Sequence, residues 1–190
     1  MAPDTTTLAR AQDAFDARLR RVEVDQWALP TVCPGWTVRD LVNHVVVGST
    51  MSVQLLDGAT VDQIRGLFHA DALGDDPMET RRQTAAAERE AFAAPGALER
   101  IVHHPAGDIP GSMLLGFRTG DNLLHSWDLA RSTGGDEVLP DDVVADVWTV
   151  LEPFGPTIAT LGVFGDGPSG TVGPDAPLQD RLLDLSGRRP

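Results

Sequence analysis

An aspartate and a histidine four residues apart, Asp121 and His125, are the residues of this chain best placed to hold a metal ion. Side chains at this spacing lie on one face of a helix, with Cβ atoms roughly 5–6 Å apart. A third ligand from His44, on an earlier helix, would complete a site with one open coordination position, which is typical of catalytic zinc. Spacing alone does not select this pair, because three of the five histidines follow an acid by four residues: Asp40/His44, Glu99/His103 and Asp121/His125.

The surroundings of the three pairs favour Asp121/His125. Asp40 follows Thr37 in the first turn of a predicted helix, where the helix dipole already favours an acid. Glu99 lies in a segment with little helical character. Asp121 instead lies in the middle of an apolar helix, where a buried carboxylate is costly unless it is paired or metal-bound. Two alternatives remain: Asp121 faces water, or His125 is a hydrogen-bonded core histidine.

Two other polar residues of the same helix could take part in the site. Asp128 lies on the His125 face and could accept a hydrogen bond that orients a metal ligand. Arg118, one turn before Asp121, could bind a substrate carboxylate or pair with that aspartate. Gly48 and Gly120 could let two helices approach closely where the ligands converge, because glycine inside a helix otherwise costs about 1 kcal/mol relative to alanine.

Two further groups are weaker candidates. Cys33 could be a reactive thiol, but a small buried side chain is the simpler interpretation. His103 and His104 are adjacent in a predicted extended segment, so their side chains point to opposite sides. Solvation in a loop or a hydrogen bond within a turn explains them more simply than a metal.

Composition excludes several classes of function. The net charge is −13, and the 15 basic residues are all arginine. This charge argues against nucleic-acid binding, which requires neutralised phosphates, and against docking on an anionic membrane. One cysteine excludes an internal disulfide. The sequence contains no signal peptide and no apolar run of the roughly 20 residues that span a bilayer, so we expect a cytoplasmic protein.

Hydrophobic periodicity predicts an all-α fold, a four-helix bundle of up-down topology with one longer connection. The long helices are expected at about 6–24, 37–56, 77–94 and 112–132, with shorter ones at 61–68 and 140–151. Residues 98–104 are expected to be extended, 105–111 to form a loop, and 177–185 to add a last helical turn or two. We expect a single domain, 1–190, with a helical core at about 6–151 and an irregular C-terminal segment at 152–190.

Three stretches resemble a known family. Cys33-Pro-Gly-Trp-Thr-Val-Arg-Asp-Leu-Val-Asn-His44 resembles the second-helix motif of DinB-like metal-binding proteins, and most closely that of the mycothiol-dependent maleylpyruvate isomerase N-terminal-domain group of actinobacteria. His104-Pro-Ala-Gly-Asp-Ile-Pro-Gly111 and Asp121-Asn-Leu-Leu-His-Ser-Trp-Asp-Leu-Ala130 are similar to further stretches of that group. The likeness runs from about residue 27 to 185.

The resemblance implies a four-helix bundle with a divalent metal held by His44, Asp121 and His125. Aspartate stands at Asp121 where the family has glutamate, so the shorter side chain requires a closer helix. Zinc is the first choice of metal, with nickel or iron as alternatives. The family suggests a mycothiol-dependent transferase or isomerase, whose partners are a small-molecule thiol and a substrate, in a monomer or homodimer. The alternatives are a noncatalytic metal-binding or small-molecule-binding bundle, and an interaction module whose structural metal has a fourth ligand, Asp40 or Asp128.

Overall fold

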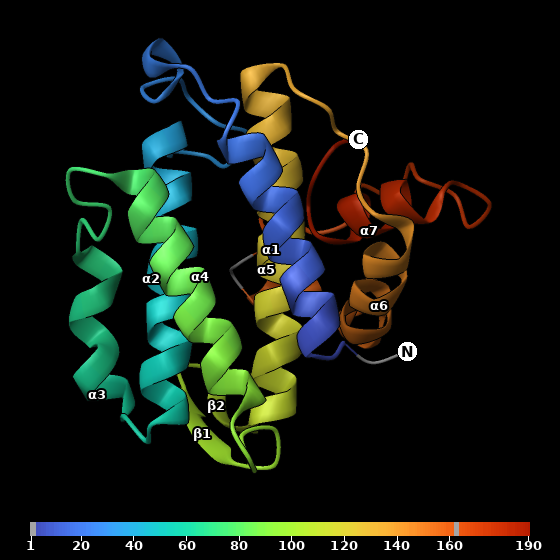
Figure 1. Cartoon of the computed structure of the whole chain (residues 1–190). Coiled ribbons are helices and arrows are strands. Elements are labelled where there is room, and N and C mark those ends of the chain that lie inside the picture. Colours follow the sequence, from blue (N-terminus) through green and yellow to red (C-terminus); the bar gives the residue numbers. More distant parts are fainter. Residues whose placement is uncertain (1–2, 162–163) are drawn as a thin grey trace.

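The structure is a computed structural model that describes residues 3–161 and 164–190. Within these residues the chain forms seven α-helices and one two-stranded sheet (Figure 1). The helices are α1 (Thr5–Leu19), α2 (Val38–Leu56), α3 (Val61–Ile64), α4 (Pro77–Ala93), α5 (Gly111–Thr133), α6 (Asp141–Leu151) and α7 (Leu178–Leu185). The strands are β1 (Ile101–His104) and β2 (Gly107–Pro110), and four 3-10 turns lie at Val24–Gln26, Arg65–His69, Glu152–Phe154 and Ile158–Leu161.

Capping residues set the ends of the helices that carry the site. The Thr37 side chain accepts a hydrogen bond from the Asp40 backbone N–H, and the Asp40 carboxylate accepts one from the Thr37 N–H, so this capping box begins α2 as predicted. Asp76 caps α4, with Pro77 as the first helical residue. Gly134 ends α5 in the left-handed conformation at φ +72°. The predictions of helices α2, α4, α5 and α6 are confirmed.

The first helix is shorter than predicted. It ends at Leu19 and not near Val24, because Glu23 and Gln26 form a capping box of their own. That box begins a separate 3-10 turn over Val24–Gln26, which redirects the chain before α2.

The prediction of a purely helical chain with a loop at 105–111 was wrong, because β1 and β2 form an antiparallel hairpin there. Val102 pairs with Ile109, and both side chains are buried against the end of α5. Gly107 supplies the turn with φ +115°, a conformation that side-chain-bearing residues rarely adopt. The β1 strand lies within the segment expected to be extended at 98–104, but β2 and its pairing with β1 were missed because each strand has only four residues. The fold is therefore mostly helical with a small sheet.

Four long helices, α1, α2, α4 and α5, lie side by side (Figure 1). Helix α1 packs on α5 and α4, and α2 packs on α4 and α5. Helices α6 and α7 cover the other side of α5, where a Cβ at Gly116 or Gly120 would contact Val150 or Val147 of α6. The role expected of Gly120, a close approach between the ligand-bearing helices, was therefore wrong, since this glycine serves the contact between α5 and α6.

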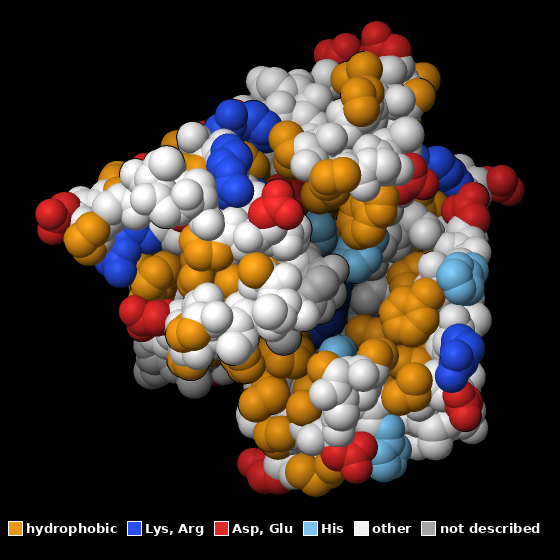
Figure 2. All heavy atoms as spheres, turned by 180° about the vertical axis from the view of Figure 1, so that it is seen from behind, with side chains coloured by type: hydrophobic (Ala, Val, Ile, Leu, Met, Phe, Trp, Pro, Cys, Tyr) orange, Lys and Arg blue, Asp and Glu red, His pale blue; other side chains and the backbone are white. Residues whose placement is uncertain are grey.

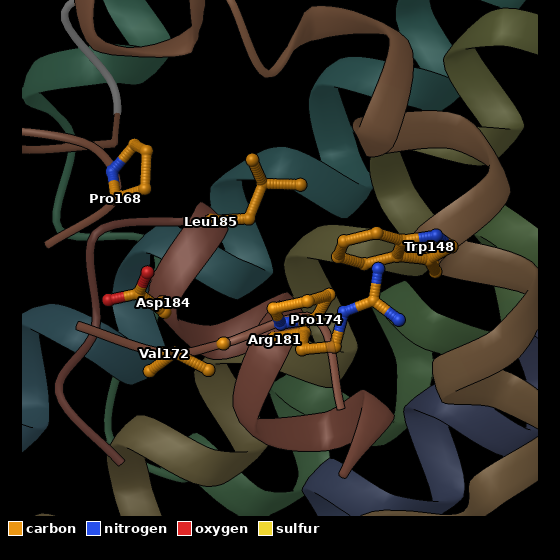
Figure 3. A pocket seen from close by; sticks show the side chains of 8 residues that line it. Trp148, Pro168, Val172, Pro174, Arg181, Asp184 and Leu185 are labelled. Carbon is orange, nitrogen blue, oxygen red and sulfur yellow. The ribbon is translucent and has the colours of Figure 1, made fainter. Parts of the chain in front are cut away.

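The C-terminal segment contains the helical turns predicted at 177–185, which form the short amphipathic helix α7. Leu182 and Leu183 are fully buried against α6. On the outer side, the Arg181 guanidinium lies 4.6 Å from the centre of the Trp148 ring, beside a pocket of about 280 Å³ (Figure 3). Apolar burial and this cation–π contact together attach the segment to α6.

Helix α5 is the longest of the described helices, and several of its buried side chains are polar. Arg118, Asn122 and Asp128 are all buried along its 23 residues. Among the described residues, no helix combines the length and the apolar character needed to cross a membrane. Buried polar side chains need hydrogen-bond partners, and the partners of these three surround the candidate site described below.

We expect Gly111→Ala to destabilise the protein by roughly 1–3 kcal/mol, the usual cost of overpacking. A Cβ at Gly111 would collide with the backbone carbonyl of Ala97, which a side-chain rotation cannot relieve. Gly66→Ala is the matched control, because nothing lies within 4 Å of a Cβ there. Urea unfolding of both variants measures the difference. Equal stability of the two would contradict the packing described for the hairpin and α5.

Candidate metal centre

Three potential ligand atoms meet between α2 and α5. The His44 Nε2 atom lies 3.0 Å from Asp121 Oδ1, and the His125 Nε2 atom lies 3.4 Å from the same oxygen. All three atoms lie within 4.8 Å of one another, and the two imidazole rings meet edge to face with centroids 4.9 Å apart. The structure thus brings together the three residues that the sequence singled out, although 77 positions separate His44 from Asp121.

This spacing fits a small divalent ion. Two ligand atoms that each bind a tetrahedral zinc at about 2.0–2.1 Å lie roughly 3.3 Å apart. The two measured separations from Asp121 Oδ1 bracket that value. Two imidazole nitrogens and one carboxylate oxygen also form a donor set that zinc, nickel and iron accept.

A second residue orients each of the two ligands from α5. Arg118 Nη1 donates to Asp121 Oδ2 at 2.7 Å, so the other oxygen, Oδ1, points toward the histidines. His125 Nδ1 lies 2.8 Å from Asp128 Oδ2, which leaves Nε2 directed at Asp121. A carboxylate behind a histidine is the usual way in which proteins fix a metal-binding tautomer.

The electrostatics of the three residues favour a cation at their centre. Burial alone would raise the pKa of Asp121, but Arg118 and the two histidines hold that pKa well below its usual value. Burial alone would lower the pKa of His125, yet Asp121 and Asp128 raise it well above the usual value. The site therefore concentrates negative potential at the His125 ring, and a metal ion could take the place of the proton there.

The candidate ligands are partly open to solvent. The face of the molecule in Figure 2 has a hollow with histidine side chains on its walls, hydrophobic side chains around it and a basic side chain inside. The Trp36 ring lies 4.8 Å from the His44 ring and 5.8 Å from that of His125. The His44 side chain is 39% exposed, whereas that of His125 is only 10% exposed, so the site opens on the His44 side.

His104 belongs to the neighbourhood of this site, which the sequence analysis did not anticipate. Its Nδ1 accepts a hydrogen bond from the Ala106 N–H, the turn interaction that was the simpler interpretation. Its ring also lies 5.7 Å from that of Phe117 on α5. Burial and the nearby Arg118 lower the pKa of His104, so it is a neutral imidazole with a proton on Nε2. Adjacent His103 points the opposite way, to Asp108 on the exposed face.

Arg118 lies in a buried network, which favours the pairing alternative over substrate binding. Its Nε donates to Glu88 Oε1 at 2.7 Å, and its Nη2 donates to the Val45 carbonyl oxygen at 3.1 Å. A Cβ at Gly48 would collide with the guanidinium, so this glycine of α2 makes room for Arg118. Together, α2, α4 and α5 hold the arginine that fixes Asp121.

The same network contains residues that sequence reasoning missed. Glu88 is fully buried and also accepts hydrogen bonds from Gln12 and Ser49. Arg81 is 1% exposed and donates to Asp16 and Asn122. The unusual density of charges in α4 gave no signal, because charged residues on a helix normally indicate a solvated face.

A second group of possible ligand atoms lies behind His125. Cys33 Sγ donates to Asp128 Oδ2 at 3.5 Å, and Cys33, His125 and Asp128 lie close enough together to hold an ion. Arg188 already contacts both oxygens of Asp128, at 3.0 and 2.6 Å, so a cation occupies this side. The geometry therefore favours the His44, Asp121 and His125 group. The two candidates for a fourth structural ligand both have other partners. The Asp128 carboxylate contacts Arg188, and the Asp40 carboxylate caps α2.

We expect Arg118→Met to destabilise the protein by about 3–5 kcal/mol, the cost of leaving a buried partner charge uncompensated. Glu88 is the fully buried partner, whereas the second partner, Asp121, keeps its contacts with the two histidines. The double variant Arg118→Met/Glu88→Gln should regain part of the loss, because the orphaned charge is gone. Urea unfolding of the metal-free proteins gives both values. A loss below about 1 kcal/mol in the single variant would contradict the buried ion pair.

Comparison with known proteins places the site in a family. Residues 8–130 match the family described as "Mycothiol maleylpyruvate isomerase N-terminal domain". Uncharacterized proteins from two strains of Mycobacterium tuberculosis are each 36% identical over 137 residues, which cover 72% of this chain and 71% of the relative.

A solved structure shares the fold. It is the crystal structure of the mycothiol-dependent maleylpyruvate isomerase, with a TM-score of 0.60 and 17% sequence identity. The match covers 75% of this chain and 65% of the isomerase, so the chain spans just under two thirds of that protein. Since the matched family region includes α1 to α5 and all three candidate ligands, the chain belongs to the mycothiol maleylpyruvate isomerase N-terminal domain family.

Proposed function

We propose that this protein binds a divalent metal ion, zinc in the first instance, through His44, Asp121 and His125. We further propose that the metal-loaded protein binds a low-molecular-weight thiol, mycothiol, and uses it in a transferase or isomerase reaction. In this proposal α1, α2, α4 and α5 constitute a DinB-like four-helix bundle, and residues 1–190 act as one domain.

One observation carries the proposal: two imidazole nitrogens lie 3.0 and 3.4 Å from a single carboxylate oxygen, at a site that is open to solvent on the His44 side. A structural histidine–aspartate pair needs one such contact, whereas a tetrahedral ion explains two. The family membership supports the thiol, because the related crystal structure is that of the mycothiol-dependent maleylpyruvate isomerase.

The protein residues would position and shield the reacting groups. A zinc ion in the site would lower the pKa of a thiol that binds it. Arg118 and Asp128 keep Asp121 and His125 oriented, so the site needs little rearrangement. Trp36 covers one side of the two histidines, and the His104 ring packs on that of Phe117, the residue before Arg118 in α5. The Nε2 proton of His104 could donate a hydrogen bond to a polar substrate group.

A noncatalytic metal-binding or small-molecule-binding protein is the alternative. The carboxylates that neighbour the ligand set favour it, because Glu88 pairs with Arg118 and Asp128 pairs with Arg188. His104 Nδ1 already accepts a backbone hydrogen bond. Each of these groups is engaged, so none is a ready general base.

We expect the protein to bind one zinc ion and His44→Ala to remove most of it while the chain stays folded. The hydrophobic core does not depend on the ion, since none of the three clusters of buried apolar residues includes a candidate ligand. His103→Ala is the matched control, because His103 pairs with Asp108 away from the site. Metal content of untagged protein and circular dichroism are measured together. Equal zinc content in both variants would show that the site is wrong.

We expect mycothiol to bind the zinc-loaded protein and not the metal-free protein. A thiolate ligand makes affinity rise as pH approaches the free thiol pKa, about 8.5 for a cysteine-like group. Coordination should move that rise to lower pH. Calorimetric titration at several pH values tests both points. Equal affinity with and without zinc would eliminate the thiol-dependent function and leave the noncatalytic alternative.

A further inference from the structure

Arg188, near the end of the chain, contacts the carboxylate that orients His125. Its Nε donates to Asp128 Oδ1 at 3.0 Å and its Nη2 donates to Asp128 Oδ2 at 2.6 Å, a two-point contact across 60 residues of sequence. Asp128 is fully buried, and only 13% of the Arg188 side chain is exposed. A bidentate arginine–carboxylate pair holds the carboxylate in one orientation, which a lysine does not do.

The end of α7 is built to place this arginine. Gly187 takes φ +80°, and its N–H donates to Asp184 while the Arg188 N–H donates to Leu183, which closes the helix. A Cβ at Gly187 would collide with the Phe164 carbonyl oxygen, so only glycine fits. Because Leu182 and Leu183 anchor α7 in the core, Arg188 leaves the helix at a fixed position.

The contacts continue without interruption to the candidate ligands. Arg188 and His125 bind the same oxygen, Asp128 Oδ2, at 2.6 and 2.8 Å. Through this hydrogen bond the opposite nitrogen of His125, Nε2, is directed at Asp121. If Arg188 were lost, the buried carboxylate would lack its cation, and it would either rotate toward water or recruit another partner. Either change would loosen the His125 ring.

We propose that Arg188 is a positioning residue for the metal centre, which makes the C-terminal segment a part of the site. This inference rests on the proposed metal binding. It assigns a role to residues outside the matched family region, which ends at residue 130. It also requires reciprocity: if docking of α7 strengthens metal binding, then metal binding must strengthen the docking of α7 by the same factor.

The test uses the full chain and cobalt(II) or zinc ions as probes. Arg188→Gln should weaken metal binding by about 10- to 100-fold, the usual effect of losing a partner behind a metal-binding histidine. It should also change the cobalt(II) absorption spectrum, which reports the ligand geometry. Arg181→Gln is the matched control, because Arg181 stacks on Trp148 in the same segment without contacting Asp128. This control should leave the spectrum unchanged and lower the metal affinity far less than Arg188→Gln does, because it loosens the segment without removing the partner of Asp128.

A double-mutant cycle separates positioning from general loss of stability. If Arg188 acts through Asp128, then Arg188→Gln should cost little further affinity in an Asp128→Asn background. Arg188→Lys retains the cation without the two-point contact, so its affinity should lie between those of the unaltered protein and Arg188→Gln. If Arg188→Gln does not fold, the metal affinity of Arg188→Lys is compared with that of the unaltered protein instead.

Hydrogen exchange provides a readout that is independent of affinity. Zinc should slow amide exchange in residues 178–188 of the unaltered protein and do so much less in Arg188→Gln. Unchanged affinity and unchanged protection in the variant would overturn this inference and leave the metal site intact. Failure of the unaltered chain to bind either metal would overturn the proposed function, and the inference with it.

Discussion

The site depends on one buried guanidinium. Arg118 makes its contacts with three helices at once: an ion pair with Glu88 of α4, an ion pair with Asp121 of its own α5, and a hydrogen bond to the Val45 carbonyl of α2. A charge in this position is stable only while each partner stays in place, so the network fixes the relative positions of the helices as well as their own side chains. Hydrophobic packing alone would tolerate sliding of α2 against α5. The hydrogen bond from Arg118 to the Val45 carbonyl restricts this sliding, and so it restricts the distance between His44 and Asp121.

Much of the fold could be predicted because its signals are local. Thr37 with Asp40, Asp76 with Pro77, and Gly134 each act within a few residues, so they identified the ends of α2, α4 and α5 from the sequence. The hairpin could not be predicted in the same way. Its strands have four residues each and its pairing depends on Gly107 turning the chain. The early end of α1 likewise depends on a separate cap, at Glu23, that hydrophobic periodicity does not reveal.

The candidate site, too, could be predicted only in part. An acid in an apolar helix pointed to Asp121, and the resemblance strengthened the choice of His44, 77 positions away, as the third ligand. The residues behind these ligands had no comparable signal. Glu88 looks like one more charge on a polar helix, and Arg188 lies near the end of a segment rich in glycine and proline. Only the packing of α4 and α7 on the rest of the chain shows that both arginine–carboxylate pairs are buried.

The net charge of the groups around the histidines bears on the proposed chemistry. Around the histidines, Glu88, Asp121 and Asp128 carry three negative charges, and Arg118 and Arg188 carry two positive ones, which leaves a net charge of −1. Arg81 does not change this sum, because it pairs with Asp16. Without a metal, the raised pKa of His125 lets a proton supply the missing positive charge. A divalent ion would replace that proton and reverse the net charge to +1, which an anionic thiolate would then neutralise. Two arginines are needed for this balance under the proposed function, because with only one of them the three carboxylates would leave a net charge of −2, which a dication would only neutralise and which would leave no positive charge to attract a thiolate.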